Sequence, residues 1–386
     1  MFRPLMVVLF AVLALPVGAS AQLTYSHTTL VHGFNDDSVR FVRPNTSGLL
    51  GRDMNLKQVQ TPSLGGYLSI DDQAANLRPR LFGSHVLAGL SMGGLTSRAA
   101  YFGPPISANV SAIITIATPH QGAPIADNAS RTTGYLVSIV VDFFDSVIRI
   151  FNKPTPGNIL NAVAVGLIHG IAREVLTDVV KVHIDAQLGV RSDGLRDIRV
   201  GSPTVSRLNG QIDALPHANV YGTIGRRNAA FRLGFSALYN DAGFEPFVRK
   251  KNRVKSVVKA CRQIAWNIIV RLEVGRVCNQ IDNALGSIDG RWAAWTMGAE
   301  ARIPSATFDG LIPTSRSRYP GTSLSDPVIN FPAPQANHMN IQYKREGTDA
   351  IVGAMAQVGM ERATPPPGGG GGDPPPNPCP PPQLEC

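Results

Sequence analysis

The sequence predicts an α/β fold built on a mostly parallel sheet. Several short, continuously apolar runs are typical of strands that are buried on both faces, and turn residues or a helix-like segment follow each run. Apolar residues make up 44% of the 386 residues, which is enough for a sizeable core and excludes wholesale disorder. The predicted strands are 28–31, 86–90, 112–116, 220–224 and 327–331.

Helical patterns account for most of the chain between these strands. Residues 71–81 and 95–101 fit helices that connect neighbouring strands. Two longer segments, approximately 127–200 and 226–301, are also helical in pattern but interrupt the alternation of strand and helix. We expect both to be helical insertions above the carboxyl edge of the sheet, where ligands of open α/β sheets bind. The strongly apolar part, 135–182, would form either a lid or the ordinary core of a cap.

The two ends of the chain do not belong to the predicted fold. Residues 1–21 have a basic start, a short apolar run and a small-residue cleavage site, which together indicate a secretory signal peptide. The mature chain, which has no later membrane-spanning run, is therefore expected to be secreted into an extracellular or periplasmic compartment. Residues 363–386 are rich in proline and glycine and predict a tail, which leaves 22–362 as the globular domain.

Charge and cysteine content narrow the classes of partner. The formal net charge is +9, and segment 249–276 alone holds nine basic residues and one acid. This segment is either a solvated helix face or a peripheral contact with an anionic lipid surface, and no nucleic-acid motif accompanies it. The four cysteines form no C-x-x-C pair, which argues against a zinc or redox site. We predict no cofactor and no metal ligand, and the sequence leaves a calcium site open. In an oxidising compartment, the most local pairing is Cys261 with Cys278 and Cys379 with Cys386.

The strongest motif is Gly89-Leu90-Ser91-Met92-Gly93, a G-x-S-x-G match directly after an apolar run and directly before a helix-like segment. Such a serine stands on a sharp strand-to-helix turn, where side chains at the flanking positions would collide with the backbone. This context predicts that Ser91 is a catalytic nucleophile. The backbone N–H of the next residue, Met92, would be one of two donors to the oxyanion that forms during attack.

Three motifs together resemble a known family. Leu30-Val31-His32-Gly33-Phe34, the motif around Ser91 and Ala117-Thr118-Pro119-His120-Gln121-Gly122 resemble, in order and spacing, the lipases and esterases of the α/β-hydrolase fold. This group is similar to bacterial triacylglycerol lipases and related lipase-like deacylases. The resemblance implies an α/β-hydrolase fold with a helical cap or lid, a structural place for His120, and the N–H of Phe34 as the second oxyanion donor.

The catalytic base follows from the order nucleophile, acid, histidine along the chain of such folds. Of the eight histidines, those at 27, 32 and 85 precede Ser91, and His120 belongs to a motif loop. Those at 169 and 183 lie in the apolar insertion, and the one at 217 precedes an apparent strand. His338 alone follows a late strand, so we expect it to be the base rather than a surface-loop histidine.

The acid should lie between Ser91 and His338. Asp309, in Asp309-Gly310-Leu311-Ile312-Pro313, resembles the acid loop of these lipases and would orient the imidazole. Asp289, which is also followed by glycine, is the alternative. The spacing departs from the family, because about 80 residues separate the strand ending near Gly225 from Asp309. Either the basic helical segment is inserted between strand and acid, or the strand assignment is wrong.

These residues predict a serine hydrolase that cleaves carboxylic esters through an acyl-enzyme. Lipase and short-chain esterase remain open, as does an acyltransferase that uses the same triad. The alternative from another class is a non-catalytic binding or surface protein on a hydrolase scaffold. That reading expects a damaged triad or oxyanion loop, whereas every part is present in this sequence.

Overall fold

A computed structural model describes residues 22–42, 44–103, 109–128, 192–211, 214–237, 239–264, 273–320 and 328–364. The predicted signal peptide, the apolar stretch 135–182 and nearly all of the proline-rich tail lie outside these residues.

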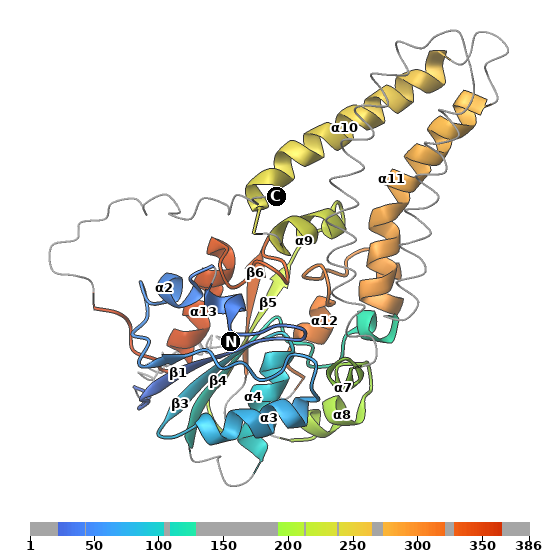
Figure 1. Cartoon of the computed structure of the whole chain (residues 1–386). Helices are drawn as coiled ribbons and strands as arrows, with labels where there is room; N and C mark the ends of the chain where they lie inside the picture. Colours follow the sequence, from blue (N-terminus) through green and yellow to red (C-terminus); the bar gives the residue numbers. More distant parts are fainter. Residues whose placement is uncertain are drawn as a thin grey trace, which may run out of the picture.

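The core element is one six-stranded sheet in which every strand pair is parallel, in the order β2-β1-β3-β4-β5-β6 (Figure 1). The α/β fold class with its parallel sheet is therefore confirmed. All five predicted strands are present, together with a two-residue edge strand, β2, that has no apolar run of its own. The strands are β1 (His27–Val31), β2 (Val59–Gln60), β3 (His85–Leu90), β4 (Val110–Ile116), β5 (His217–Thr223) and β6 (Ile329–Pro334).

Both faces of the sheet are buried, which explains why its strands have no polar alternation. Along β3, Val86 and Ala88 belong to one hydrophobic cluster and Leu87 belongs to the other, as the two-residue period of a strand requires. Helices α1, α2 and α13 supply or adjoin the first cluster, and α3, α4, α7 and α8 supply the second. Their bounds are α1 (Val39–Val42), α2 (Thr46–Leu50), α3 (Ile70–Leu77), α4 (Met92–Phe102), α7 (Asp193–Asp197), α8 (Pro203–Asn209) and α13 (Arg345–Gln357).

Two predicted boundaries are corrected by local chemistry. Helix α3 begins after Ser69, whose hydroxyl accepts a hydrogen bond from the N–H of Asp72, and it ends at Leu77 rather than at residue 81. A 3-10 turn containing Pro79 follows, because proline has no N–H to continue the α-helical ladder. Strand β5 starts at His217, before the predicted start at 220, since its polar residues already pair with β4.

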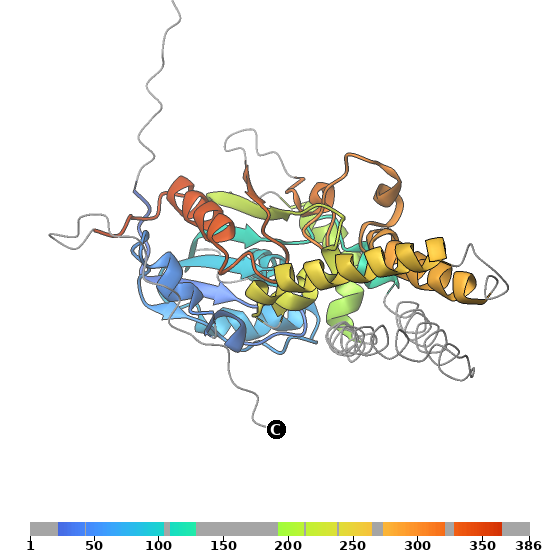
Figure 2. The same cartoon turned by 90° about the horizontal axis from the view of Figure 1, so that it is seen from above.

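The chain between β5 and β6 leaves the sheet and forms helices α9 to α12, here called the helical excursion. Helices α10 and α11 lie side by side and project away from the body (Figures 1 and 2). The excursion packs on the body through an apolar cluster that includes Leu233, Trp292 and Phe308. In the part of the chain that the structure covers, no helix is both long and apolar enough to cross a bilayer. The bounds are α9 (Ala229–Ala237), α10 (Asp241–Ile264), α11 (Glu273–Met297) and α12 (Thr314–Ser317).

The excursion returns to the point from which it left. Ile224, directly after β5, forms an antiparallel bridge with Phe308, and the N–H of Ile224 donates to the carbonyl oxygen of Phe308 at 2.8 Å. Asp309 therefore follows β5 in space although about 80 residues lie between them in the chain. The strand assignment is correct, and the helical segment is inserted between the strand and the predicted acid.

Candidate active site

The predicted nucleophile, Ser91, lies on the turn between β3 and α4, at the carboxyl end of the sheet. Its backbone has φ 54° and ψ −126°, a region that costs a non-glycine residue on the order of 1–3 kcal/mol. The flanking glycines let the turn close. A Cβ on Gly89 would lie 2.4 Å from the carbonyl oxygen of Gly93, and one on Gly93 would lie 2.3 Å from that of Val31. The G-x-S-x-G motif is therefore a strained strand-to-helix turn that larger residues would force open.

The structure brings the three predicted triad side chains into one line. Nε2 of His338 lies 2.9 Å from Oγ of Ser91, and Nδ1 of His338 lies 2.7 Å from Oδ2 of Asp309. His338 is 7% exposed and Asp309 is fully buried, so water competes little for these hydrogen bonds. In this geometry the imidazole can accept the serine proton at Nε2 while its Nδ1–H donates to the carboxylate.

The loop of Asp309 explains why one carboxylate oxygen faces the histidine. Oδ1 accepts the backbone N–H groups of Leu311, at 2.9 Å, and Ile312, at 2.8 Å. Oδ2 is thereby directed to Nδ1 of His338. The backbone N–H of His338 also donates to the backbone carbonyl oxygen of Asp309 at 2.7 Å. The alternative acid, Asp289, lies in α11, and the histidine contacts Asp309 instead.

The two predicted oxyanion donors flank Ser91. Met92 is the first residue of α4. Phe34 lies in the loop after β1, directly after Gly33, and this loop passes Ser91 at Gly33. A Cβ on Gly33 would lie 2.9 Å from Cβ of Ser91, so the loop backbone runs directly beside it. The preceding His32 fixes that loop: its Nε2 accepts the N–H of Leu64 at 2.9 Å, and its Nδ1 lies 3.0 Å from the carbonyl oxygen of Gly33. Burial lowers the pKa of His32, which favours the neutral ring that can accept at Nε2.

The histidine of the third motif, His120, lies elsewhere. It is fully buried, with Nε2 3.0 Å from Oγ1 of Thr115 and its ring edge-on to Tyr319 at 5.0 Å between centroids. Desolvation holds the pKa of His120 well below its usual range, so the ring is neutral. These contacts give His120 a place in the packing behind the sheet edge.

Sequence reasoning missed Asp36 and Arg40, which follow the oxyanion loop. Nε of Arg40 lies 3.3 Å from Oδ2 of Asp36, and the Arg40 side chain is only 7% exposed. Burial raises the pKa of Asp36 to about 6, against the opposing effects of Arg40 and His338. An Asp and an Arg four residues apart are common on any helix, so spacing alone could not mark this pair as part of the site.

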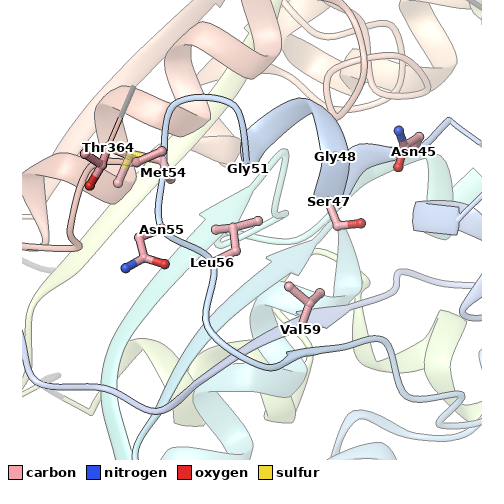
Figure 3. Close-up of a pocket in the computed structure, with 10 residues that line it drawn as sticks. Asn45, Ser47, Gly48, Gly51, Met54, Asn55, Leu56, Val59 and Thr364 are labelled. Atoms are coloured by element: carbon pink, nitrogen blue, oxygen red, sulfur yellow. The ribbon is translucent and has the colours of Figure 1, made fainter. Parts of the chain in front are cut away.

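The groove in Figure 3 does not belong to this site. Among the residues that the structure describes, no cluster of three His, Cys, Asp or Glu side chains could hold a metal ion. The groove lies near the start of β2, and none of its lining residues belongs to the predicted site (Figure 3). Its walls come from α2, the chain leading into β2, and the end of the described chain at Thr364.

Comparisons with known proteins agree with the fold. A family model described as a PGAP1-like alpha/beta domain matches residues 75–180, less than half of the chain. No curated protein matches. The sheet and the serine turn confirm the resemblance to α/β-hydrolases at the level of the fold.

Solved structures that resemble the chain include a lipase, an extracellular alpha/beta-hydrolase and a phospholipase. The mature lipase BlEst2 of Bacillus licheniformis is 15% identical with a TM-score of 0.44, over 86% of this chain and 92% of that chain. An extracellular alpha/beta-hydrolase from a Paenibacillus species is 14% identical with a TM-score of 0.29, over 50% and 76%. Phospholipase PlaB from Legionella pneumophila is 15% identical with a TM-score of 0.28, over 51% and 39%. These values are too low to assign an activity.

Proposed function

We propose that this protein is a secreted serine hydrolase that cleaves carboxylic esters, as a lipase or esterase. One observation carries the proposal: Ser91, His338 and Asp309 form a continuous hydrogen-bonded line on a strained serine turn. Geometry of this kind, rather than fold, marks a catalytic site. Secretion rests on the predicted signal peptide at residues 1–21.

The chemistry follows from the positions of the atoms. Oγ of Ser91 attacks the ester carbonyl while Nε2 of His338 takes its proton, and Asp309 stabilises the resulting imidazolium. The N–H groups of Phe34 and Met92 hold the oxyanion. The imidazolium then gives its proton to the departing alkoxide, which leaves an acyl-serine. Water, deprotonated by His338, releases the carboxylic acid and restores the hydroxyl of Ser91.

Apolar side chains adjoin each part of this machinery, which favours an acyl chain as the bound group. Phe34 is itself in the oxyanion loop, Leu311 follows Asp309 by two residues, and Met339 is next to His338. All three are partly buried hydrophobic residues packed against apolar clusters. Partly buried apolar residues that neighbour the proposed catalytic residues along the chain suit the hydrocarbon part of an ester.

The test is a series of p-nitrophenyl esters with acyl chains of increasing length, combined with fluorophosphonate labelling. We expect hydrolysis and covalent labelling of the peptide that carries Ser91, and loss of both in Ser91→Ala. Thr96→Ser, a small change one turn into α4, is the control variant: it is expressed and purified in the same way and should keep the wild-type activity. A folded Ser91→Ala variant that hydrolyses these esters at the wild-type rate would refute the proposal.

The basic segment extends the proposal to an anionic lipid surface. Among the α10 side chains that the structure describes, the exposed cations are Arg249, Lys250, Arg253 and Lys259. Lys251, by contrast, is buried: its Nζ donates to Oδ1 of Asn228 and lies 4.8 Å from the centroid of the Phe231 ring. Lys251 therefore belongs to the packing of α10 against Asn228 and α9, and not to the contact surface.

This contact should be electrostatic and therefore sensitive to salt. We expect the protein to bind vesicles of phosphatidylglycerol better than vesicles of phosphatidylcholine, and to dissociate as the screening length falls from about 8 Å to about 3 Å at 1 M salt. Replacing Lys250, Arg253 and Lys259 with Gln should reduce binding in the same way. Equal sedimentation with both kinds of vesicle would contradict the contact, without touching the proposed ester chemistry.

A further inference from the structure

The loop that carries His338 is closed by two asparagines. Oδ1 of Asn337 accepts the N–H groups of Met339, at 2.9 Å, and Asn340, at 3.1 Å. In return, Oδ1 of Asn340 accepts the N–H of Asn337 at 2.8 Å. Both amides are almost completely buried, and their hydrogen bonds span His338 from one side to the other. The orientation of the imidazole therefore depends on how these two side chains are held.

The amide nitrogens of both asparagines point to the base of the helical excursion. Nδ2 of Asn337 donates to Oγ of Ser236 at 2.8 Å, and Nδ2 of Asn340 donates to the same oxygen at 3.2 Å. Nδ2 of Asn340 also donates to Oδ2 of Asp241 at 3.2 Å, while the hydroxyl of Ser236 donates to Oδ1 of Asp241. Ser236 is in the last turn of α9, and Asp241 is the first residue of α10.

Arg40 contacts the same loop. Its Nη2 donates to the carbonyl oxygen of Met339 at 2.7 Å, directly after His338. Its Nη1 lies 3.5 Å from the hydroxyl of Tyr239, in the link between α9 and α10, and its guanidinium stands 5.9 Å from the centroid of that ring. The segment after the oxyanion loop, the histidine loop and the base of α10 thus meet in one polar cluster.

We propose that Asp241 is a positioning residue for His338, through which the base of the α10–α11 hairpin sets the orientation of the catalytic imidazole. Its carboxylate is the group that accepts from both Ser236 and Asn340. A hydrogen bond to a charged acceptor is stronger than one between neutral groups, and buried partners left without it are costly. This inference rests on the proposed function, because it concerns the base of that same triad.

The chemistry of the side chains predicts which change should break the cluster and which should restore it. Asp241→Asn offers one acceptor oxygen and places an NH2 group against a donor, either the hydroxyl of Ser236 or Nδ2 of Asn340. Adding Asn340→Asp exchanges donor and acceptor, so that the new amide at 241 donates to the new carboxylate at 340, which can also accept from the hydroxyl of Ser236 in place of the hydrogen bond that Nδ2 of Asn340 donates there. The carboxylate at 340 can still accept the N–H of Asn337, which keeps the loop closed.

The experiment compares kcat, KM and the rate of fluorophosphonate labelling in purified full-length variants. Asp241→Asn should lower kcat and the labelling rate about 10²-fold, the order expected for a misplacement near 1 Å, with KM little changed. The double variant Asp241→Asn/Asn340→Asp should recover at least tenfold of the loss. Glu245→Gln, an exposed carboxylate one turn further along α10, is the matched control and should behave as wild type.

The outcomes separate the two proposals. A wild-type protein that neither hydrolyses esters nor labels at Ser91 would refute the proposed function itself. If the wild type is active, Asp241→Asn with full kcat and only a lower melting temperature would refute the positioning role. So would equal losses in Asp241→Asn and Glu245→Gln, or a double variant no better than the single one.

Discussion

Replacing Gly33 with alanine should damage catalysis without unfolding the protein. The new Cβ would lie 2.9 Å from Cβ of Ser91, 3.1 Å from the carbonyl oxygen of Leu90 and 3.4 Å from Oγ of Ser91. Because carbon atoms rest at roughly 3.5–4.0 Å, the loop and the serine must separate by about 0.6–1 Å. His32 resists that shift, since both of its ring nitrogens are tied to the backbone around the loop.

The displaced group is the N–H of Phe34, the second proposed oxyanion donor. Losing one such donor costs about 10²–10³ in kcat, and a misplacement near 1 Å costs about 10². We therefore expect Gly33→Ala to lower kcat on p-nitrophenyl butyrate by about 10²-fold, equivalent to about 2.7 kcal/mol of transition-state stabilisation, with a small change in KM. Stopped-flow or steady-state hydrolysis measures both quantities.

A matched glycine provides the control. Gly225, at the end of β5, would place an added Cβ in open space, so Gly225→Ala should keep the wild-type kcat. Circular dichroism melting shows whether Gly33→Ala remains folded. A folded Gly33→Ala enzyme with wild-type kcat would show that the loop beside Ser91 has no part in stabilising the oxyanion.

Three further outcomes can be measured independently. Asp309→Asn should lower kcat by roughly 10²-fold or more, because the amide cannot hold the imidazole as the carboxylate does; near-normal turnover would remove Asp309 from the triad. The carboxyl of Asp36, whose pKa is raised from 3.8 to about 6, binds its proton more tightly in the folded state. Its contribution to the free energy of unfolding therefore declines as pH rises from 3.8 to about 6. Asp36→Asn should therefore gain on the order of 1–3 kcal/mol relative to wild type between pH 4 and pH 7 in urea titrations, and parallel pH profiles would argue against the raised pKa. Non-reducing peptide mapping should link Cys261, in α10, to Cys278, in α11; free thiols at both positions would overturn that pairing.

The parts of the site that the sequence predicts are those whose geometry leaves a local pattern. The glycines around Ser91 are adjacent in sequence because one tight turn requires them all, and chain order then selects His338. Asp309, the proposed acid, can also be predicted across a long insertion, since the Asp-Gly pair and the following proline stay together in the sequence. The fold class followed from apolar runs that two buried faces produce.

Other features leave no such pattern. The two-residue strand β2 is defined by pairing with β1 rather than by its own composition. Ser236 and Asn337 meet across 101 residues of chain, and a buried serine or asparagine looks like any loop residue in a single sequence. Partners this distant are brought together by the fold, so only the folded chain reveals them.

The bridge between Ile224 and Phe308 lets the inserted helices α10 and α11 change in length. Where the two ends of an insertion already touch, the entropy of closing it grows only with the logarithm of its length, so helical turns can be added to or removed from α10 and α11 at a small cost in free energy. The sheet need not adjust to such changes. The reach of α10 and α11 can therefore change with little effect on the sheet, whereas Ser236 and Asp241 at their base are held by hydrogen bonds to the histidine loop. The ends of α10 and α11 that lie away from the sheet are accordingly suitable places to graft a new recognition element onto this protein.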